Sequence, residues 1–321
     1  MAKKTVTINP RKAAMVGCGF VGSASVFALM QSGVFSEIVL IDADKAKAEG
    51  EAMDISHGVA YGKPCKIYAG DYSDVGDASI VIITAGANQK PDETRLDLVN
   101  KNVSIMKSII PEIMKTGFAG ILLIVANPVD ILTYVAQKLS GLPESHVIGS
   151  GTVLDTARFK TELGEHLSVD SRSIHAFIIG EHGDSEIVAW SSANVSSVPL
   201  LQFCTMRGFD EHEAAMENIA ESVKNSAAVI IEKKRATYYG IAMSVRRICE
   251  CIIRDEKSIL PVSAIQHCGY GVDGIAFSMP AIVGRFGVEK VIPIQLNEKE
   301  KEELHASALV LKQVIDESVG F

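Results

Sequence analysis

Short apolar runs alternate with helical segments through the first 150 residues of this 321-residue chain. Uninterrupted runs of four or five apolar residues are typical of strands buried on both faces of a parallel sheet. Their alternation with helices predicts a doubly wound α/β fold. We expect strands at residues 13–16, 38–41, 80–84, 121–125 and 147–148, and helices at 22–32, 45–57, 96–116 and 129–140.

The pattern becomes mixed after about residue 150, which predicts a second domain of the α+β type. The expected boundaries are therefore 1–149 for a Rossmann-type domain and 150–321 for the second domain. The pair Asn297 and Glu300 predicts the cap of a last helix. We further expect helices at 151–164, 210–234 and 239–254, strands at 174–179, 187–190 and 195–198, and three strands between 258 and 294.

Bulk composition narrows the classes of partner. A net charge of -8 argues against general nucleic-acid binding, which needs a basic surface. The six cysteines form no CxxC pair, which favours reduced thiols in the cytoplasm and no metal site. The uncharged stretch 13–30 is long enough to suggest a membrane segment, but its glycines fit a strand–turn–helix better, so we expect no membrane span.

A glycine-rich turn follows the first expected strand and opens the first helix. Residues Gly17 to Gly22 match G-x-G-x-x-G, and Asp42 lies 20 residues further on, at the end of the second strand. Such glycines let the backbone approach a pyrophosphate at a helix N-terminus. A carboxylate at position 42 would bond ribose hydroxyls and repel a 2′-phosphate, so NAD is favoured over NADP. The alternative for Asp42 is a helix N-cap.

A second motif places a histidine after the apolar run 174–179. Residues 180–184 read Gly-Glu-His-Gly-Asp, so the imidazole of His182 is flanked by two carboxylates and two glycines. Histidine exchanges protons near neutral pH without perturbation. His182 is therefore the candidate acid–base, and the alternative is a hydrogen-bonded structural histidine.

Taken together, the motifs resemble the L-lactate/malate dehydrogenase family. The resemblance spans nearly the whole chain, in family order and spacing, and rests on eight segments: Gly17–Gly22, Asp42, 86–91 (GANQKP), 95–98 (RLDL), 127–130 (NPVD), 155–158 (DTAR), 180–184 (GEHGD) and 236–240 (ATYYG).

The resemblance implies roles for four charged residues. His182 would give a proton to a ketone oxygen, and Asp155 would orient the imidazole and favour its charged form. Arg158, three residues after Asp155, would clamp the substrate carboxylate with its planar fork. Arg95 would polarise the ketone when a mobile lid closes. Alternatives are a helix-dipole role for Asp155, a salt bridge for Arg158 and a solvated loop position for Arg95.

The remaining implied contacts depend more heavily on the resemblance. Asn127 would contact nicotinamide and substrate, Thr237 and Ile241 would line the substrate methyl and the nicotinamide, and Ser150 would lie near the carboxamide. For Thr237, Ile241 and Ser150 the alternative is a core or capping role. The other expected cofactor contacts are Gly17, Gly19, Phe20, Val21, Gly22, Gly86 and Ala87.

Residue Gln89 bears on the substrate. In the family, malate-specific members carry an arginine at this lid position to meet the second carboxylate. A neutral amide would leave that charge unpaired in a closed site, at a cost of several kcal/mol. Pyruvate and L-lactate are therefore favoured over oxaloacetate and malate. The alternatives are a malate dehydrogenase or a non-catalytic NAD-binding relative.

The resemblance also implies a homo-oligomer, expected to be a tetramer. Bacterial members are often activated by fructose 1,6-bisphosphate held by an arginine and a histidine between subunits. The matching positions here are Lys160 and His175. Lysine keeps the charge but lacks the fork of arginine, so bisphosphate activation is left open.

Overall fold

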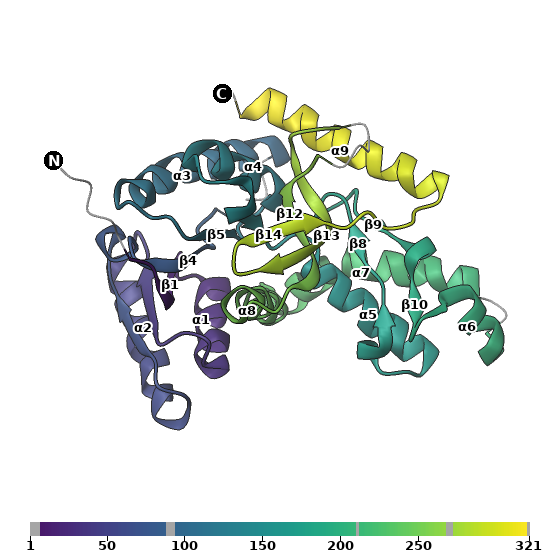
Figure 1. Ribbon diagram of the computed structural model, residues 1–321, viewed down its shortest axis with the longest axis horizontal. Coiled ribbons are helices and arrows are strands. Elements are labelled where there is room, and N and C mark those ends of the chain that lie inside the picture. The colour runs from purple at the N-terminus through teal and green to yellow at the C-terminus, as the bar shows by residue number, and fades with distance from the viewer. Residues whose placement is uncertain (1–6, 88–93, 210–211, 268–271, 320–321) are drawn as a thin grey trace.

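The computed structural model describes residues 7–87, 94–209, 212–267 and 272–319. Its centre is a nine-stranded sheet in the order β14-β13-β12-β6-β5-β4-β1-β2-β3, shown in Figure 1. The strands from β3 to β6 in this order run parallel, as the alternation with helices predicts. The bounds are β1 (Asn9–Val16), β2 (Glu37–Ile41), β3 (Lys66–Ala69), β4 (Ala78–Ile83), β5 (Ile121–Ile124), β6 (Val147–Gly149), β12 (Ser258–Ile265), β13 (Ala276–Gly284) and β14 (Gly287–Val291).

Helices cover both faces of the sheet. Ala14 and Val16 of β1 pack on one side with helices α3, α4 and α9, whereas Ala13 and Met15 pack on the other with α1, α2 and α8. This alternation is the period-two geometry of a strand buried on both faces. The helices are α1 (Phe20–Ser32), α2 (Lys45–His57), α3 (Arg95–Lys115), α4 (Val129–Ser140), α5 (Val153–Leu167), α6 (Leu200–Arg207), α7 (His212–Lys234), α8 (Tyr239–Arg254) and α9 (Glu298–Ser318).

The three antiparallel strands of the second half extend the same sheet. Strand β12 pairs with β6 at Ser263 and Gly149, and β13 and β14 follow outward. The predicted cap of α9 is confirmed, since Asn297 and Glu300 exchange side-chain and backbone hydrogen bonds. Its apolar residues Leu304, Ala308, Leu311 and Ile315 are buried. The division at residues 149 and 150 stays a prediction.

The expected strand at 174–179 is wrong as a single element. The chain forms β7 (Ile174–His175) and β8 (Ile178–Ile179), which pair in two different small sheets. The N–H of Ile178 donates to the hydroxyl of Thr156 over 2.9 Å instead of to a strand. Ile174, Ala176, Ile178 and Ile179 are all buried, so hydrophobicity alone could not reveal the break.

Two neighbouring predictions are corrected in the same region. The 187–190 run is shortened to β9 (Ile187–Val188), because a 3₁₀ turn follows from Trp190. The 195–198 run is divided between β10 (Asn194–Val195) and β11 (Val198–Pro199), since Ser196 and Ser197 have positive φ and form a turn. Helix α6 and strand β3 were not expected from the sequence.

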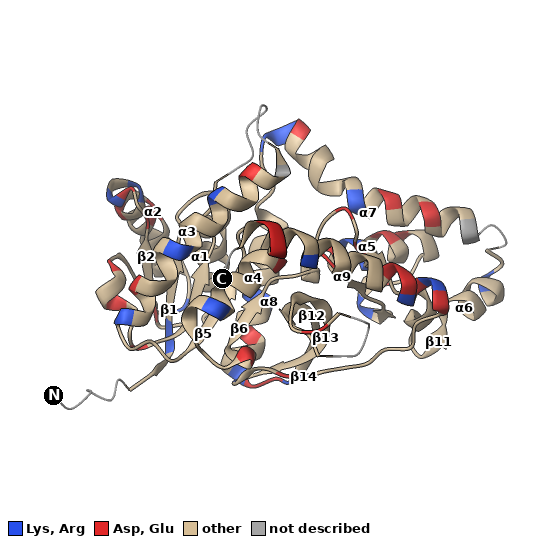
Figure 2. Ribbon diagram, turned by 90° about the horizontal axis from the view of Figure 1, so that it is seen from above, with Lys and Arg blue, Asp and Glu red and all other residues tan. Residues whose placement is uncertain are grey.

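The charged residues and the cysteines can now be placed on the fold. Figure 2 shows acidic and basic residues interspersed along α7 and α9. Within the described ranges, the five cysteines at 18, 65, 204, 249 and 251 are free thiols, and Cys268 lies outside them. None of the helices in these ranges has the length and apolar character needed to cross a bilayer.

Candidate active site

The glycine-rich turn between β1 and α1 is shaped for a ligand. Gly17 has a φ of 101°, and a Cβ there would lie 2.5 Å from the backbone nitrogen of Ala85. A Cβ on Gly22 would lie 2.0 Å from the carbonyl oxygen of Gly17, so both positions require glycine. Gly19, the N-cap of α1, has open space around its Cβ position and no side-chain cap. The free N–H groups of this helix end therefore suit a pyrophosphate.

Asp42 holds the same turn from the end of β2. Its Oδ2 accepts the N–H of Cys18 at 2.6 Å, and its Oδ1 accepts the N–H of Asp44 at 3.0 Å. The cap of α2 is Asp44, which accepts the N–H of Lys47. The N-cap alternative for Asp42 is therefore wrong, and its half-buried carboxylate stands beside the glycine-rich turn.

A buried asparagine that sequence reasoning missed joins two expected contact segments. Asn102 of α3 accepts the N–H of Ala87 at 2.7 Å and donates to the carbonyls of Ala87 at 3.2 Å and Asn127 at 2.7 Å. Its side chain thereby fixes Gly86–Ala87 against the end of β5. An asparagine inside an otherwise apolar helix face was the available signal.

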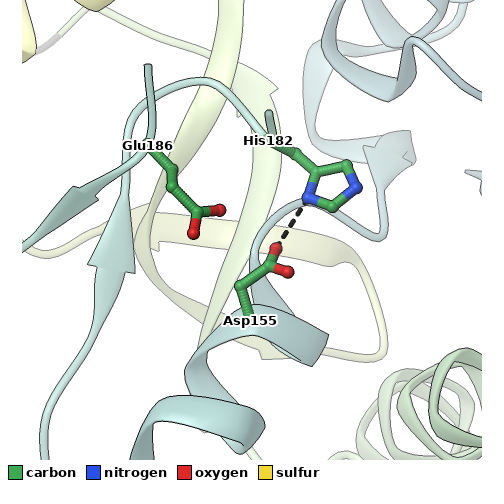
Figure 3. Close-up of side chains that lie close together, drawn as sticks. All are labelled: Asp155, His182 and Glu186. Carbon is green, nitrogen blue, oxygen red and sulfur yellow. Dashed lines mark hydrogen bonds and ion pairs between the residues drawn. The ribbon is translucent and has the colours of Figure 1, made fainter. Parts of the chain in front are cut away.

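His182, Asp155 and Arg158 form one connected group. His182 Nδ1 lies 2.6 Å from Asp155 Oδ2, and the Arg158 guanidinium donates to Asp155 Oδ1 at 3.0 Å. Asp155 is 3% exposed at its side chain, His182 26% and Arg158 14%. Figure 3 shows the imidazole facing Asp155 from the loop above α5, with Glu186 nearby. Since Asp155 bonds Nδ1, Nε2 is the ring nitrogen left to exchange a proton with a ligand.

The surroundings keep this imidazole charged. Burial opposes the charge on His182, but attraction and hydrogen bonding to Asp155, with Asp130 and Glu186 nearby, raise its pKa to about 9. Burial likewise opposes ionisation of Asp155, but His182 and then Arg158 outweigh it and lower the pKa of that carboxyl. The pair therefore exists as imidazolium and carboxylate near neutral pH.

A second carboxylate supports the histidine through its backbone. Asp130 of α4 is 1% exposed, and its Oδ2 accepts the N–H of His182 at 2.7 Å. Burial raises the pKa of Asp130 to about 6, although Ser263, the His182 N–H and the imidazolium lower it. The role of Asp130 could not be predicted from the sequence, because only the tertiary structure brings it within reach of residue 182.

The C-terminal helix also anchors the histidine loop. The hydroxyl of Ser307 on α9 accepts the N–H of Glu181 at 3.0 Å and lies 2.9 Å from the hydroxyl of Ser185. Ser185 in turn donates to the Glu181 carboxylate at 2.5 Å. Residues on both sides of His182 are thus fixed to α9.

A cavity of about 270 Å³ opens in front of the imidazole, at the carboxyl edge of the parallel strands. His182, Asn127 and Leu98 are among its lining residues. Ligands bind at this edge in open α/β sheets. Arg95 is the first residue of α3, one turn before Leu98, and its side chain lies outside the described set. Gln89 also lies outside the described residues.

The residues expected from the family resemblance to contact cofactor or substrate, among them Ser150 and Thr237, lie at different places along the carboxyl edge of the sheet. Ser150 is buried, and its N–H donates to the carbonyl of Ile124 at 2.8 Å. Tyr238, next to the half-buried Thr237, stacks on Phe20 with ring centroids 5.4 Å apart. That contact brings the 236–240 segment beside the start of α1, where Phe20 is exposed and Val21 half-buried.

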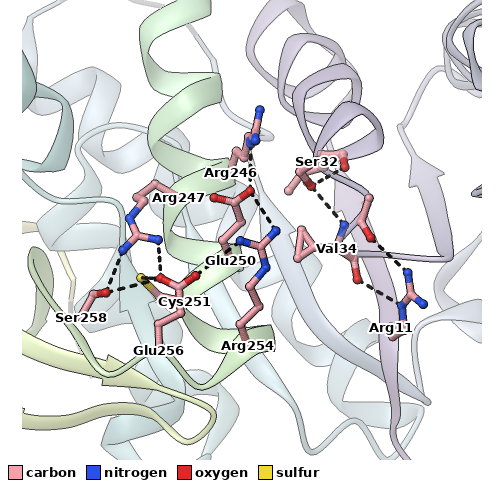
Figure 4. Close-up of polar contacts among 12 residues, drawn as sticks. Arg11, Ser32, Val34, Arg246, Arg247, Glu250, Cys251, Arg254, Glu256 and Ser258 are labelled. Carbon is pink, nitrogen blue, oxygen red and sulfur yellow. Dashed lines mark hydrogen bonds and ion pairs between the residues drawn. The ribbon is translucent and has the colours of Figure 1, made fainter. Parts of the chain in front are cut away.

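Lys160 and His175 line a separate cavity of about 360 Å³, together with Arg172 and Arg247. Burial lowers the pKa of Lys160. Arg247 is held by Glu256 and Ser258 in the network of Figure 4, where Glu250 also lies between Arg246 and Arg254. Four basic residues from different segments therefore line this cavity, although the Arg172 guanidinium is paired with Asp170 at 2.6 Å.

The fold and the site together define an NAD-dependent oxidoreductase. Residues 11–149 match the model of the lactate/malate dehydrogenase NAD binding domain, and residues 152–321 match that of the lactate/malate dehydrogenase alpha/beta C-terminal domain. The chain belongs to the lactate/malate dehydrogenase family.

Individual relatives match over nearly their whole length. The chain is 52% identical to L-lactate dehydrogenase 1 of Clostridium acetobutylicum over 305 residues, covering 95% of this chain and 97% of the relative. It is 49% identical to an L-lactate dehydrogenase of Priestia megaterium, covering 98% of each chain. The ligands-bound crystal structure of minor L-lactate dehydrogenase from Enterococcus mundtii matches with a TM-score of 0.92 and 45% identity, covering 96% of this chain and 98% of that one.

Proposed function

We propose that the protein acts as an NAD-dependent L-lactate dehydrogenase, converting pyruvate, NADH and a proton reversibly to L-lactate and NAD. The observation that carries the proposal is the His182–Asp155–Arg158 group, with 2.6 Å and 3.0 Å contacts, beside a cavity at the carboxyl edge of the sheet. The relatives named as L-lactate dehydrogenases support the same activity.

The glycine-rich turn fits the expected cofactor. Open space at Gly19 and the uncapped start of α1 would receive the pyrophosphate, and Asp42 would receive the ribose hydroxyls. A carboxylate at position 42 repels a 2′-phosphate, which favours NAD over NADP. Bound NADH supplies the hydride that reduces the ketone carbon.

The chain supplies the proton and the orientation of the substrate. His182 gives its Nε2 proton to the ketone oxygen and takes it back in the reverse direction. Asp155 fixes the tautomer through Nδ1 and stabilises the imidazolium. The Arg158 guanidinium bonds Asp155 through one nitrogen, and its other N–H groups would bind the substrate carboxylate. Arg95, at the start of α3, would stabilise the negative charge that develops on the ketone oxygen.

The most direct experiment compares pyruvate and oxaloacetate as substrates for NADH oxidation. Because residue 89 is a glutamine, we expect kcat/KM to be higher for pyruvate. A higher value for oxaloacetate would instead support a malate dehydrogenase. Absence of turnover with either would support a non-catalytic NAD-binding relative.

We further propose a homotetramer activated by fructose 1,6-bisphosphate. The cavity that contains Lys160 and His175 is lined by four basic side chains and suits a doubly phosphorylated ligand. Pyruvate saturation should change from sigmoidal to hyperbolic when the bisphosphate is added, and sedimentation should give the mass of four chains. A sigmoidal curve unaffected by the bisphosphate would contradict the activation.

Two further assignments complete the proposal. The division into residues 1–149 and 150–321 would separate cofactor binding from the groups that handle the substrate. The free thiols of the described cysteines support a location in the cytoplasm.

A further inference from the structure

A third ionisable side chain lies beside the His182–Asp155 pair. A carboxylate oxygen of Glu186, one of Asp155 and a ring nitrogen of His182 all lie within 4.8 Å of one another. Figure 3 shows the Glu186 carboxylate directed toward the edge of the imidazole that bonds Asp155. At such distances an ionised carboxylate has a substantial effect on an imidazolium, because both are partly screened from water.

The loop that carries His182 fixes this placement. The N–H of Glu186 donates to the carbonyl of Gly183 at 3.2 Å, and Gly183 has a φ of 151°. This turn reverses the chain after His182, so that Glu186, the residue before β9, faces His182. The Ser185 hydroxyl is hydrogen-bonded to the Glu181 carboxylate and to the Ser307 hydroxyl, so the turn is anchored to α9.

The opposite side of Glu186 reaches a larger cavity of about 970 Å³ between α7, α9 and the histidine loop. Glu186 therefore lies within 4.8 Å of His182 and Asp155 and also lines this cavity, through which its carboxyl group can exchange protons with water. The other charged groups that line the cavity are Glu217, Glu221 and Lys224 from α7 and Lys299, Glu300 and Glu303 from α9.

We propose that Glu186 is a positioning residue that acts through His182: once ionised, it is a second counter-ion that keeps the imidazolium charged as the solution becomes alkaline. The inference rests on the proposed function, because it concerns the proton that His182 gives to the substrate.

The titration of Glu186 agrees with this role. Burial and then repulsion from Asp155 raise the pKa of Glu186 to about 8, while His182, Arg158 and Lys224 lower it. The side chain is therefore mainly a neutral acid near neutral pH and becomes a carboxylate over the range in which His182 would begin to lose its proton. Glutamine imitates the neutral form and lacks the ionised one.

The test is the pH profile of kcat/KM for pyruvate in the native protein, Glu186→Gln and Glu186→Asp. Removing the ionised form should lower the alkaline midpoint of Glu186→Gln by about one pH unit, as expected for loss of a nearby opposite charge. Its loss of kcat/KM should therefore grow with pH, from within about twofold near pH 6.5 to about tenfold near pH 9.5. Glu186→Asp, which keeps a carboxylate, should recover most of the alkaline range.

The matched control is Glu217→Gln, an exposed glutamate that lines the same cavity from α7. Its profile should coincide with that of the native protein. An alkaline midpoint in Glu186→Gln equal to the native value would overturn the inference. A loss of the same size at every pH would also overturn it, since that would indicate a structural role only.

A readout without substrate separates this inference from the proposed function. In the ligand-free protein labelled at its histidines, the NMR titration of the His182 ring should also move down by about one pH unit in Glu186→Gln. If the native protein did not reduce pyruvate, the proposed function would fail while this titration still tested Glu186. An unchanged His182 titration in a protein that reduces pyruvate would refute Glu186 alone.

Discussion

The backbone N–H of His182 donates to Asp130 Oδ2 across 2.7 Å, which fixes the imidazole loop to the start of α4. The bond is charge-assisted and part-buried, and charge-assisted bonds contribute more to stability than neutral ones. Within the described residues, Asp130 Oδ1 has no hydrogen-bond partner. One carboxylate thus supports the backbone of His182, while a second, Asp155, orients its ring.

Replacing Asp130 should destabilise the protein. Asp130→Ala would remove a hydrogen bond to a buried carboxylate and leave the half-buried N–H of His182 without this acceptor, so the free energy of unfolding should fall by about 1–3 kcal/mol. Asp130→Asn keeps an acceptor and should cost less. Denaturant unfolding at one fixed protein concentration measures both, with the exposed Asp54→Ala as control. An Asp130→Ala protein as stable as the control would show that the bond has no net effect on stability.

The two directions of the reaction should depend on pH in opposite ways. In the proposed reaction, pyruvate reduction needs a protonated His182, whose pKa is raised to about 9 because Asp155 outweighs the effect of burial. Its kcat/KM should therefore hold up to about pH 9 and fall above it. Lactate oxidation needs the neutral ring, so its kcat/KM should rise toward the same pH. Profiles measured in both directions that moved together would contradict this assignment.

Arg158 should prove sensitive to a substitution that keeps its charge. Arg158→Lys removes the planar fork but not the positive charge. The KM for pyruvate should rise by about tenfold to a hundredfold, as expected when a bidentate bond worth about 1.5–3 kcal/mol is weakened. The Kd of NADH, measured by fluorescence, should stay at the native value. A native KM for pyruvate in this variant would mean that Arg158 forms the ion pair with Asp155 but does not bind the substrate carboxylate.

The substrate preference should respond to residue 89. Gln89→Arg would supply a positive charge for a second carboxylate, and each 1.4 kcal/mol or so gained corresponds to about a tenfold change. The ratio of kcat/KM for oxaloacetate to that for pyruvate should rise by at least about tenfold. Gln137→Arg on α4 provides a control glutamine away from the proposed site. An unchanged ratio in Gln89→Arg would remove residue 89 as the determinant of specificity.

Much of the fold could be predicted, because apolar runs and helical patterns in the sequence coincide with the strands and helices of the structure. The helices at 45–57, 129–140 and 239–254 have the expected bounds, and the buried strands from β1 to β6 were identified except β3. Strand β3 was missed because it is short and begins with a lysine, so it lacks the four- or five-residue apolar run that marked the other strands. In the structure Lys66 is exposed and only one of the four residues is fully buried. The break between β7 and β8 was missed because Ala176 and Ile178 are both buried, so apolar character continues through the turn.

The site could be predicted in part. The contact between His182 and Asp155 could be expected, because the family resemblance implied that Asp155 orients the imidazole. The ion pair between Arg158 and Asp155 is the salt bridge considered as the alternative for Arg158, and the binding of a substrate carboxylate by Arg158 stays a prediction. Asn102, Asp130 and Glu186 could not be assigned in this way. Asn102 bonds Asn127, and Asp130 bonds His182, in both cases across a long stretch of sequence. Glu186 approaches His182 across a turn, so all three roles depend on the tertiary structure.

In the proposed reaction, His182 carries the proton that is transferred to the substrate. This claim is tested by measuring kcat/KM for pyruvate-dependent NADH oxidation in His182→Gln and in the native protein, with NADH binding checked in both. Loss of a positioned acid–base should lower kcat/KM by about 10²–10⁴-fold while NADH still binds. Turnover of His182→Gln within about twofold of the native rate would contradict the claim, because an acid–base group contributes far more than that.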